Sequence, residues 1–318
     1  MKTILIANPK AGRRFLLNLY LPQVRRLLES HGVDVRILFT RRPGHATQLV
    51  RRYRSGADFV TVFGGDGTVR EAVAGMCDRP LPLGIIPFGT VNVLSLDLGI
   101  PSNPVGAARV ILEGHTRRID VGFLNREPFL LMVSTGIDAM AVHNLDFRAK
   151  RYFGQMAYMA SALWTALTDR PRRIRVRIEA TEPVDAAGPV AATGQLPATG
   201  VRDSGYLAIV SNSRYYAGPY RIAEETRIDD GLLNVLLFKK SSLLDTLRLV
   251  LGLLTRRHRL MRDVAFYSGK VIRLSSRTRV KMQMDGDRAP PPPATVWLKE
   301  RLLEVYVPRT EGRRTHAR

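Results

Sequence analysis

The sequence of 318 residues contains a single cysteine, Cys77. One cysteine excludes an intrachain disulfide and any metal cluster held by several thiolates, which fits a reducing compartment. The simplest role for Cys77 is that of a small buried helix residue. The fold must therefore rest on hydrophobic cores, and 45% hydrophobic residues in a chain of this length favour two domains.

Long apolar runs are also missing. No segment approaches the roughly 20 apolar residues that span a bilayer. The apolar run Ile4–Ala7 leads directly into Asn8-Pro9-Lys10, so it is too short for the hydrophobic region of a signal peptide. We expect a cytoplasmic protein.

Acidic residues are scarce, with 28 Asp and Glu against 49 Lys and Arg and a net charge of +21. Such a charge permits polyanionic partners, either nucleic acid or the anionic face of a membrane. No RNP-type aromatic motif or zinc-finger spacing is present, so we expect no nucleic-acid partner. Because arginine richness can equally reflect genome composition, the charge alone does not specify a partner.

A glycine-rich loop, Gly64-Gly65-Asp66-Gly67-Thr68, follows the apolar run Phe59–Phe63. Its glycines allow a sharp turn and close approach to a ligand, and the following segment can begin a helix whose free N–H groups favour an anion. Asp66 beside phosphates requires a cation such as Mg²⁺ between them. The loop therefore predicts a Mg-nucleotide site, although an ordinary strand-to-helix turn remains the alternative.

Strand and helix patterns alternate through the first third of the chain. We expect strands at residues 2–8, 34–40, 59–63 and 83–86, with helices at 15–30, 44–54 and 69–76. This alternation predicts a Rossmann-like α/β domain over 1–119 with a parallel sheet. Ligands of such sheets lie beyond the carboxyl ends of the strands, where the segments beginning at Asn8, Thr40, Gly64 and Pro87 fall.

From Asp120 onward, period-2 patterns predict a mostly antiparallel β-sandwich domain over 120–308, whose final strand could return toward the first domain. The expected strands are 128–133, 174–179, 207–212, 232–238, 270–275, 279–284 and 302–307. We also expect a helix at 154–167, a long exposed loop at 184–204, and a stiff connector at Pro290–Pro293. Residues 309–318 form a basic tail that we expect to be flexible.

Seven short motifs occur in order along the chain. They are Asn8-Pro9-Lys10-Ala11-Gly12, Gly64-Gly65-Asp66-Gly67-Thr68 with Glu71, Pro87-Phe88-Gly89-Thr90-Val91-Asn92, Ile119-Asp120-Val121-Gly122, Gly136-Ile137-Asp138-Ala139, Asp230-Gly231-Leu232-Leu233-Asn234-Val235 and Met284-Asp285-Gly286-Asp287. With these motifs, nearly the whole chain resembles the diacylglycerol kinase catalytic-domain family of bacterial lipid kinases, within the superfamily of sphingosine kinases and NAD kinases.

The resemblance implies transfer of the ATP γ-phosphate to a lipid hydroxyl, with ATP and Mg²⁺ bound in a cleft between the domains. The family's nucleotide contacts fall on Asn8, Pro9, Lys10, Ala11, Gly12, Thr40, Gly64, Gly65, Asp66, Gly67, Thr68, Val69, Arg70, Glu71 and Thr90. Main-chain N–H groups of the loops can cradle phosphate oxygens, and the threonine hydroxyls can donate to phosphate or ribose. Asp66 is expected to contact magnesium through water.

A second, structural cation site is implied at Arg227, Asp230 and Leu232, where Asp230 supplies the carboxylate and the other two supply backbone carbonyls. An Asp-Gly turn between strands is the simpler alternative. The family's general base, usually glutamate, corresponds to Asp287. Asp285 lies two residues away and, in an extended strand, would face the same side. Two solvated turn acids are the alternative interpretation.

The chain departs from the family pattern at Asp287, at Arg70, where asparagine is usual, and at Leu96, where many relatives carry arginine. Asp120 and Asp138 are expected to support the site from behind, although either could cap a turn. Tyr215, Tyr216 and Trp164 are expected to be packing residues.

The segment 239–262 carries a leucine stripe followed by basic residues. It could lie on an anionic membrane leaflet, or face the core with its basic end favoured by the helix dipole.

The expected function is therefore an ATP- and Mg²⁺-dependent lipid kinase that contacts the inner membrane surface peripherally, with homo-oligomerisation left open. An NAD kinase shares the glycine loop and is the enzymatic alternative. A weakly catalytic lipid- or nucleotide-binding protein is the alternative from another class.

Overall fold

The computed structural model describes residues 1–12, 14–144, 171–179, 195–196, 200–216, 220–222, 226–255 and 257–309. The chain divides into two compact units, Met1–Ile119 with Leu303–Arg318, and Asp120–Leu302. From the sequence, the final strand of the expected second domain, 120–308, could return toward the first domain, and the division places its end there. Residues from Leu303 onward belong to the first unit because the last strand, β19 (Ala294–Tyr306), pairs there through Val305 with Leu83.

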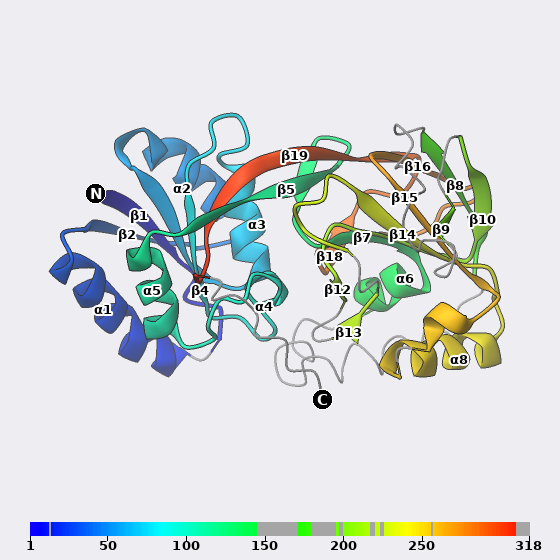
Figure 1. Cartoon of the computed structure of the whole chain (residues 1–318), viewed down its shortest axis with the longest axis horizontal. Helices are drawn as coiled ribbons and strands as arrows, with labels where there is room; N and C mark the ends of the chain where they lie inside the picture. Colours follow the sequence, from blue (N-terminus) through cyan, green and yellow to red (C-terminus); the bar gives the residue numbers. More distant parts are fainter. Residues whose placement is uncertain are drawn as a thin grey trace. The chain divides into compact units, whose positions relative to one another are not determined.

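The first unit contains a parallel sheet in the order β19-β4-β3-β1-β2 (Figure 1). Besides β19, its strands are β1 (Lys2–Ala7), β2 (Asp34–Phe39), β3 (Phe59–Gly64) and β4 (Leu83–Pro87). Every residue of β3 and β4 is buried, as expected for strands that are covered on both faces.

Five α-helices and a 3-10 turn of the first unit connect these strands: α1 (Arg14–Ser30), α2 (His45–Tyr53), η1 (Arg54–Gly56), α3 (Asp66–Ala74), α4 (Val93–Asp97) and α5 (Pro104–Glu113). Helix α1 packs with α5, and α2 packs with α3. Helix α3 begins three residues before the expected Val69, because the N–H groups of Thr68 and Val69 donate to the Gly65 carbonyl at 2.9 and 3.1 Å. Asp66 therefore occupies the first turn of a helix.

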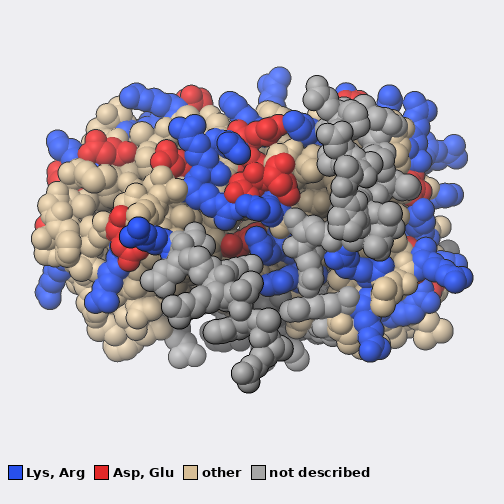
Figure 2. Space-filling view, viewed as in Figure 1, with Lys and Arg blue, Asp and Glu red and all other residues tan. Residues whose placement is uncertain are grey.

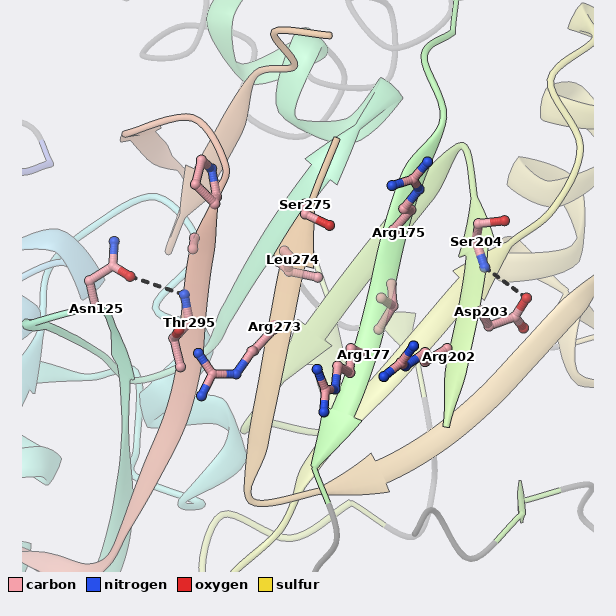
Figure 3. A pocket seen from close by; sticks show the side chains of 13 residues that line it. Asn125, Arg175, Arg177, Arg202, Asp203, Ser204, Arg273, Leu274, Ser275 and Thr295 are labelled. Carbon is pink, nitrogen blue, oxygen red and sulfur yellow. Dashed lines mark hydrogen bonds between the residues drawn. The ribbon is translucent and has the colours of Figure 1, made fainter. Parts of the chain in front are cut away.

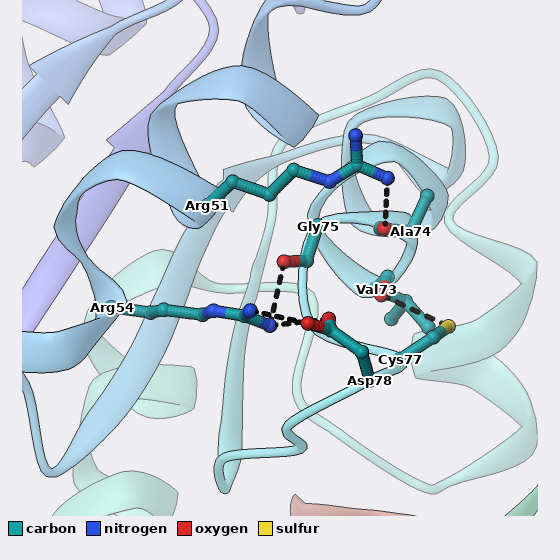
Figure 4. A network of polar contacts seen from close by, with 7 residues as sticks. All are labelled: Arg51, Arg54, Val73, Ala74, Gly75, Cys77 and Asp78. Carbon is teal, nitrogen blue, oxygen red and sulfur yellow. Dashed lines mark hydrogen bonds and ion pairs between the residues drawn. The ribbon is translucent and has the colours of Figure 1, made fainter.

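An ion pair ties η1 to the chain that follows α3 (Figure 4). Arg54 donates from Nη1 and Nη2 to the two carboxylate oxygens of Asp78, each at 2.6 Å, and Nη1 also donates to the Gly75 carbonyl at 3.1 Å. These hydrogen bonds lower the pKa of Asp78 well below its usual range. Cys77 is half-buried in the same turn, after the helix rather than within it, and its thiol donates to the Val73 carbonyl at 3.2 Å.

The second unit is a β-sandwich of two sheets. One sheet has the order β18-β17-β7-β11-β14-β15-β9 and is antiparallel except between β15 and β9. Its strands are β7 (Met132–Gly136), β9 (Gln195–Leu196), β11 (Leu207–Ser211), β14 (Leu233–Phe238), β15 (Val264–Gly269), β17 (Met282–Met284) and β18 (Asp287–Ala289).

The other sheet contains the antiparallel order β10-β8-β16-β19, where β10 is Arg202–Gly205, β8 is Ile174–Glu179 and β16 is Val271–Ser275. Strand β5 (Thr116–Leu124) pairs with β19 and with β6 (Glu127–Phe129). The core combines side chains of both sheets, such as Val133, Val210 and Val235 from one and Val176 and Ile272 from the other.

The remaining elements of the second unit are α6 (Ile137–Asn144), α8 (Leu243–Leu254), η3 (His258–Leu260) and the small hairpin of β12 (Tyr215–Tyr216) and β13 (Tyr220–Arg221). Together the two units confirm the expected fold class, an α/β domain followed by a mostly antiparallel β-sandwich. Within the described ranges, no helix is both long and apolar enough to cross a bilayer.

Several expected elements differ from the structure. The expected strand 128–133 is two strands, β6 and β7, interrupted at Leu130 and Leu131. The expected loop 184–204 contains β9 and the start of β10, and β5 and β15 were not anticipated. Strand β19 begins directly after the prolines, eight residues before the strand expected at 302. The expected helix 154–167, with Trp164, and residues 310–318 of the tail lie outside the described residues.

Candidate functional site

The order of the first sheet creates a switch point at β1, which has β2 on one side and β3 on the other. In sheets of this kind, ligands bind outside the carboxyl ends of the strands at the place where the chain order reverses. Asn8 follows β1, Thr40 follows β2, Gly65 follows β3 and Phe88 follows β4. The structure therefore places the expected nucleotide-binding segments at the carboxyl ends of four neighbouring strands.

Asn8 joins the loop after β1 directly to the loop after β3. Its main-chain N–H donates to the Phe63 carbonyl at 3.0 Å, and its side-chain Nδ2 donates to the Thr68 hydroxyl at 2.9 Å. Its Oδ1 accepts the Lys10 N–H at 2.9 Å. Asn8 thus holds its own loop in a turn and fixes the first turn of α3, so these residues act as one preformed unit.

The glycine loops after β3 and β4 touch through their backbones. A Cβ placed on Gly89 would lie 2.7 Å from Gly65 Cα and 2.7 Å from Asn92 Oδ1. Asn92 holds the second loop closed, since its Oδ1 accepts the Gly89 N–H at 2.8 Å and its Nδ2 donates to the Gly89 carbonyl at 3.0 Å. Gly12 has φ +58°, and a Cβ there would lie 2.8 Å from the Phe88 carbonyl oxygen. Side chains larger than hydrogen do not fit where the three loops meet.

Asp66 has partners that the sequence did not reveal. Its Oδ2 accepts the Val93 N–H at 2.9 Å and its Oδ1 accepts the Leu94 N–H at 3.1 Å, so the carboxylate caps the N-terminus of α4. A negative charge is favourable at that position. The signal for this contact, the left-handed Asn92 just before the helix, is visible only in the structure.

Glu71, expected among the nucleotide contacts, caps another helix. Its two carboxylate oxygens accept the N–H groups of Gly44 and Ala46 at 2.7 and 3.1 Å, at the start of α2. The Thr47 hydroxyl donates to the Glu71 carbonyl at 2.7 Å. Glu71 therefore fastens α2 to α3, and its contact with nucleotide remains a prediction.

The other expected nucleotide contacts differ in accessibility. Thr40 is buried, and its N–H donates to the Ala7 carbonyl at 2.9 Å. Lys10, Gly12 and Thr90 are exposed; Gly64, Thr68 and Val69 are buried; and Asn8, Pro9, Ala11, Gly65, Asp66, Gly67 and Arg70 are half-buried. The loops at the carboxyl ends of the strands thus present exposed and half-buried groups, and the residues beneath them are buried.

The described residues contain no group of three or more His, Cys, Asp or Glu side chains that could hold a metal. Magnesium does not require one, because it is usually held by one or two carboxylates, several waters and the phosphates of the substrate. The half-buried Asp66 supplies one such carboxylate, which the N–H groups of Val93 and Leu94 hold in place. The Asp66 site therefore fits a water-linked Mg²⁺.

The Asp230 loop closes on itself. The Asp230 carboxylate accepts the N–H groups of Arg227 and Leu232, each at 3.0 Å, around Gly231 with φ +73°. Burial raises the pKa of Asp230, and the charges of Asp120 and Asp229 raise it further. This is the Asp-Gly turn that was the simpler alternative, and a cation at Arg227, Asp230 and Leu232 remains a prediction.

The chain bends at Gly286, so Asp285 and Asp287 do not belong to one extended strand. Met284 pairs with Asp287, and Asp285 and Gly286 form the two-residue turn with φ +49° and +81°. The Asp285 carboxylate accepts the N–H groups of Leu130, Leu131 and Met132 at 2.8–2.9 Å. Asp285 is therefore a structural anchor, and the role of the half-buried Asp287 as general base remains a prediction.

A buried polar network supports this hairpin. Gln283 accepts the Gly286 N–H at 2.9 Å and donates from Nε2 to Asp138 at 3.0 Å. Asp138 also accepts hydrogen bonds from the hydroxyls of Ser134 and Tyr216. Burial raises the pKa of Asp138 against these donors, and burial also raises the pKa of Tyr216. Tyr216, expected only to pack, and Gln283 were missed as parts of this network.

Asp120 is fully buried and holds two segments of the second unit. Its carboxylate accepts the N–H groups of Gly231 at 2.8 Å and Arg301 at 2.7 Å. Of the two roles expected for Asp120, the capping of a turn is the one that the described contacts support.

Comparison with known families gives two matches. A family model described as "Diacylglycerol kinase catalytic domain" matches residues 2–124, and one described as "YegS C-terminal NAD kinase beta sandwich-like domain" matches residues 131–307.

Among curated relatives, a diacylglycerol kinase of Staphylococcus epidermidis is 26% identical over 309 residues, covering 96% of this chain and 92% of the relative. A diacylglycerol kinase of Staphylococcus aureus is 27% identical over 308 residues, covering 96% and 91%. Both comparisons extend over nearly the full length of each chain.

Solved structures from Bacillus anthracis have the same fold. One aligns at 25% identity with a TM-score of 0.79 over 97% of this chain and 95% of its own. Another, a diacylglycerol kinase with 21% identity, aligns with a TM-score of 0.68 over 97% of each chain. The likeness in fold thus covers both units.

Proposed function

Because the chain belongs to the diacylglycerol kinase catalytic-domain family, we propose that it transfers the γ-phosphate of ATP to a hydroxyl group of diacylglycerol or a related lipid. Family membership supports a phosphotransferase. The observation that best supports an ATP donor site is the junction of loops at the switch point, where Asn8 bonds to Thr68 and Gly65 meets Gly89 through the backbone.

The first unit would hold the nucleotide. Main-chain N–H groups at the start of α3 and in the Asn8 loop can donate to phosphate oxygens, and the dipole of α3 favours their negative charge. Mg²⁺, when bound, neutralises part of the phosphate charge. Asp66 would contact it through water while α4 keeps the carboxylate in place.

Asp287 would act on the acceptor. As the lipid oxygen bonds to the γ-phosphorus, the bond from that phosphorus to the β–γ bridging oxygen breaks, ADP leaves, and Asp287 accepts the hydroxyl proton. Phosphoryl transfer depends chiefly on positioning and charge neutralisation, so an aspartate in place of the usual glutamate is compatible with activity.

Helix α8 would provide a peripheral contact with the inner face of the membrane. Leu244 and Leu251 lie about two turns apart on one side of the helix and are 78% and 61% exposed, whereas Leu249 on the other side is 2% exposed. The buried Leu249 supports the interpretation that this helix faces the core, and the exposed Leu244 and Leu251 support the interpretation that it contacts a membrane. Exposed leucines near basic residues suit a membrane interface.

The test is incubation of the full-length protein with radiolabelled ATP, Mg²⁺, mixed lipid vesicles and NAD. We expect label in the organic phase, as a phosphorylated lipid. Label on NAD would instead support a kinase of the NAD kinase type, an alternative favoured by the name of the second matching family model. ATP binding without transfer would support the weakly catalytic alternative, and mass spectrometry of the labelled lipid identifies the acceptor.

Asp66→Asn tests the magnesium role. The amide keeps one oxygen for the α4 N–H groups but loses the negative charge, so we expect turnover to fall about a hundredfold or more. The Mg²⁺ concentration for half-maximal activity should also rise. An unchanged rate and an unchanged Mg²⁺ dependence would rule out the assigned role.

A further inference from the structure

A hollow of about 700 Å³ lies in the second unit, and its lining includes none of the residues assigned above to nucleotide, base or metal. Four arginines of three neighbouring strands line it: Arg175 and Arg177 of β8, Arg202 of β10 and Arg273 of β16 (Figure 3). We call these four residues the arginine hollow. Arg175 and Arg177 alternate along β8 with Ile174, Val176 and Ile178, which are buried in the core. These arginines therefore lie on the solvent face of the sheet.

The strand register places these side chains in rows. Arg202 pairs with Arg177, Arg177 pairs with Arg273, and Arg273 pairs with Thr295, so three guanidinium groups follow one another across the sheet. In the next row, Arg175 lies between Ser204 and Ser275. Neighbouring strands are about 4.8 Å apart, which allows two guanidinium groups to reach one phosphate.

Among the described residues, the nearby acid Glu179 bonds to Arg273 and also attracts Arg177, and Asp203 bonds to partners outside the row. Glu179 accepts from Arg273 Nε at 2.5 Å, and Asp203 accepts from Lys239 Nζ at 2.8 Å and from the Tyr267 hydroxyl at 2.5 Å. Like charges directly opposite each other destabilise a sheet. In the part of the chain that the structure describes, this row of three arginines hydrogen-bonds to one carboxylate, that of Glu179, so it is a cost to the fold that an anionic ligand would offset.

The chemistry of the lining favours phosphate. Guanidinium groups bind phosphate through paired hydrogen bonds, and Ser204, Ser275 and Thr295 add hydroxyl donors. The described residues of the lining include no aromatic side chain on which a nucleobase could stack. Figure 2 shows Lys and Arg also gathered along the right-hand edge of the visible face, over β8 and β10.

We propose that the arginine hollow binds the phosphate groups of anionic lipids and docks the second unit on a bilayer surface. The choice of a lipid over other phosphate-bearing partners rests on the proposed function, because an enzyme with a lipid acceptor works at a surface rich in such groups. The hollow would then hold the protein at the membrane independently of ATP.

The experiment measures sedimentation of the full-length protein with vesicles of phosphatidylcholine alone or mixed with phosphatidylglycerol, without ATP. The test variant is Arg175→Gln, Arg177→Gln and Arg202→Gln together; Arg273 is kept because Glu179 depends on it. The control is Arg26→Gln, Arg109→Gln and Arg118→Gln, three exposed arginines of the first unit with the same total charge. Glutamine retains much of the stem in both variants.

We expect the test variant to lose about a hundredfold in affinity for the anionic vesicles and the control to lose only a few-fold. Equal losses in both variants would overturn the proposal, because net charge alone would then explain the binding. Unchanged binding of the test variant would also overturn it. A test variant that still binds vesicles but loses affinity for a single-stranded DNA oligonucleotide would overturn the proposal as well, because the arginines would then bind nucleic acid rather than lipid.

Failure of this inference is distinguishable from failure of the proposed function. If the wild-type protein labels no lipid but its vesicle binding depends on the arginine hollow, the docking surface stands and the kinase assignment falls. If the wild-type protein labels lipid and the test variant binds anionic vesicles as well as the control does, only the docking surface is overturned.

Discussion

Aspartate carboxylates in this protein repeatedly hold main-chain N–H groups from distant parts of the sequence. Asp66 binds α4, Asp120 binds the chain at Gly231 and Arg301, and Asp285 binds the turn before β7. A buried or half-buried N–H group without a partner costs about 1–3 kcal/mol, so these acids contribute to stability whatever their catalytic role. Substitution of Asp285 should therefore lower the stability of the protein, whereas substitution of Asp287 should lower its activity.

Asp287→Asn should lower kcat about a hundredfold, by removal of the group that accepts the hydroxyl proton. Asp285→Asn should instead destabilise by about 1–3 kcal/mol, because the amide NH₂ cannot accept the N–H groups. Asparagine tolerates positive φ, so the turn itself is preserved. Steady-state kinetics and urea unfolding separate the two effects.

Asp287→Glu serves as the control and should hold or raise the rate, because it restores the length of the family's usual base. Wild-type kcat in Asp287→Asn would exclude Asp287 as the base.

The Arg54–Asp78 pair should make a pH-dependent contribution to stability. The folded-state pKa of Asp78 lies below the ordinary value of 3.8, so the contribution is present above that value and is lost as the pH falls through the folded-state pKa. Asp78 is 69% exposed, and solvent therefore limits the contribution to about 1 kcal/mol or less. Urea unfolding of wild type and Asp78→Asn should differ at pH 7 and converge well below pH 4; a constant difference across that range would argue against the pair.

The glycine loop can be located from the sequence, but the contacts of several of its residues cannot. Glycines, acid and hydroxyl sit within five consecutive positions, so local pattern suffices to find them. The partners of Asp66 lie 27 and 28 positions away, and those of Asp285 about 150. These pairings depend on how the strands assemble, which local pattern does not report.

Among the elements, the loops after β3 and β4 fit together only because both carry glycine at the contact. Gly89→Ala would place a Cβ 2.7 Å from Gly65 Cα, and backbone cannot move as a flexible side chain can. We expect Gly89→Ala to push the two loops apart. This should weaken ATP binding about tenfold and lower the free energy of unfolding by about 1–3 kcal/mol. Isothermal titration calorimetry and thermal unfolding measure the two quantities.

Gly56→Ala is the matched control, because a Cβ at Gly56 would meet no atom within 4 Å and this glycine has no positive φ. It should leave both quantities unchanged. If Gly89→Ala behaves like Gly56→Ala, close contact between the loops is not needed for ATP binding.

Element prediction succeeded for the strands of the first sheet and failed where neither an apolar run nor a clean alternation marks a strand. Strands β1, β3 and β4 contain apolar runs, and together with β2 they were found nearly to the residue. Strand β5, buried along most of its length, and the long β19, which carries Lys299, Glu300 and Arg301 in its middle, lack a clean alternation. Their course follows from tertiary pairing rather than local sequence.

At the scale of the molecule, β19 belongs to both units. Its last residues, Leu303, Val305 and Tyr306, are buried in the first unit at 1%, 0% and 6% exposure. A chain that stops after Leu302 should lose roughly 5 kcal/mol from that unit, comparable with the whole stability of a domain. Hydrogen exchange should show that the amides of β4 lose protection, because Val305 pairs with Leu83.

A chain that stops after Arg309 keeps β19 complete and is the control. It should exchange like the wild type in β4. Equal protection of β4 in both truncated chains would mean that the first unit does not need the strand.

Because the first unit consists of two separate segments of the chain, its sheet can be completed only late in synthesis. The ribosome makes Met1–Ile119 first, but the edge strand that completes their sheet emerges only after all of Asp120–Leu302. At about 5–20 residues per second, the exposed side of β4 waits roughly 10–40 s for its partner. The nascent chain thus carries an open, apolar sheet edge for most of its translation, and chaperones have their longest opportunity to act on the unit that is made first.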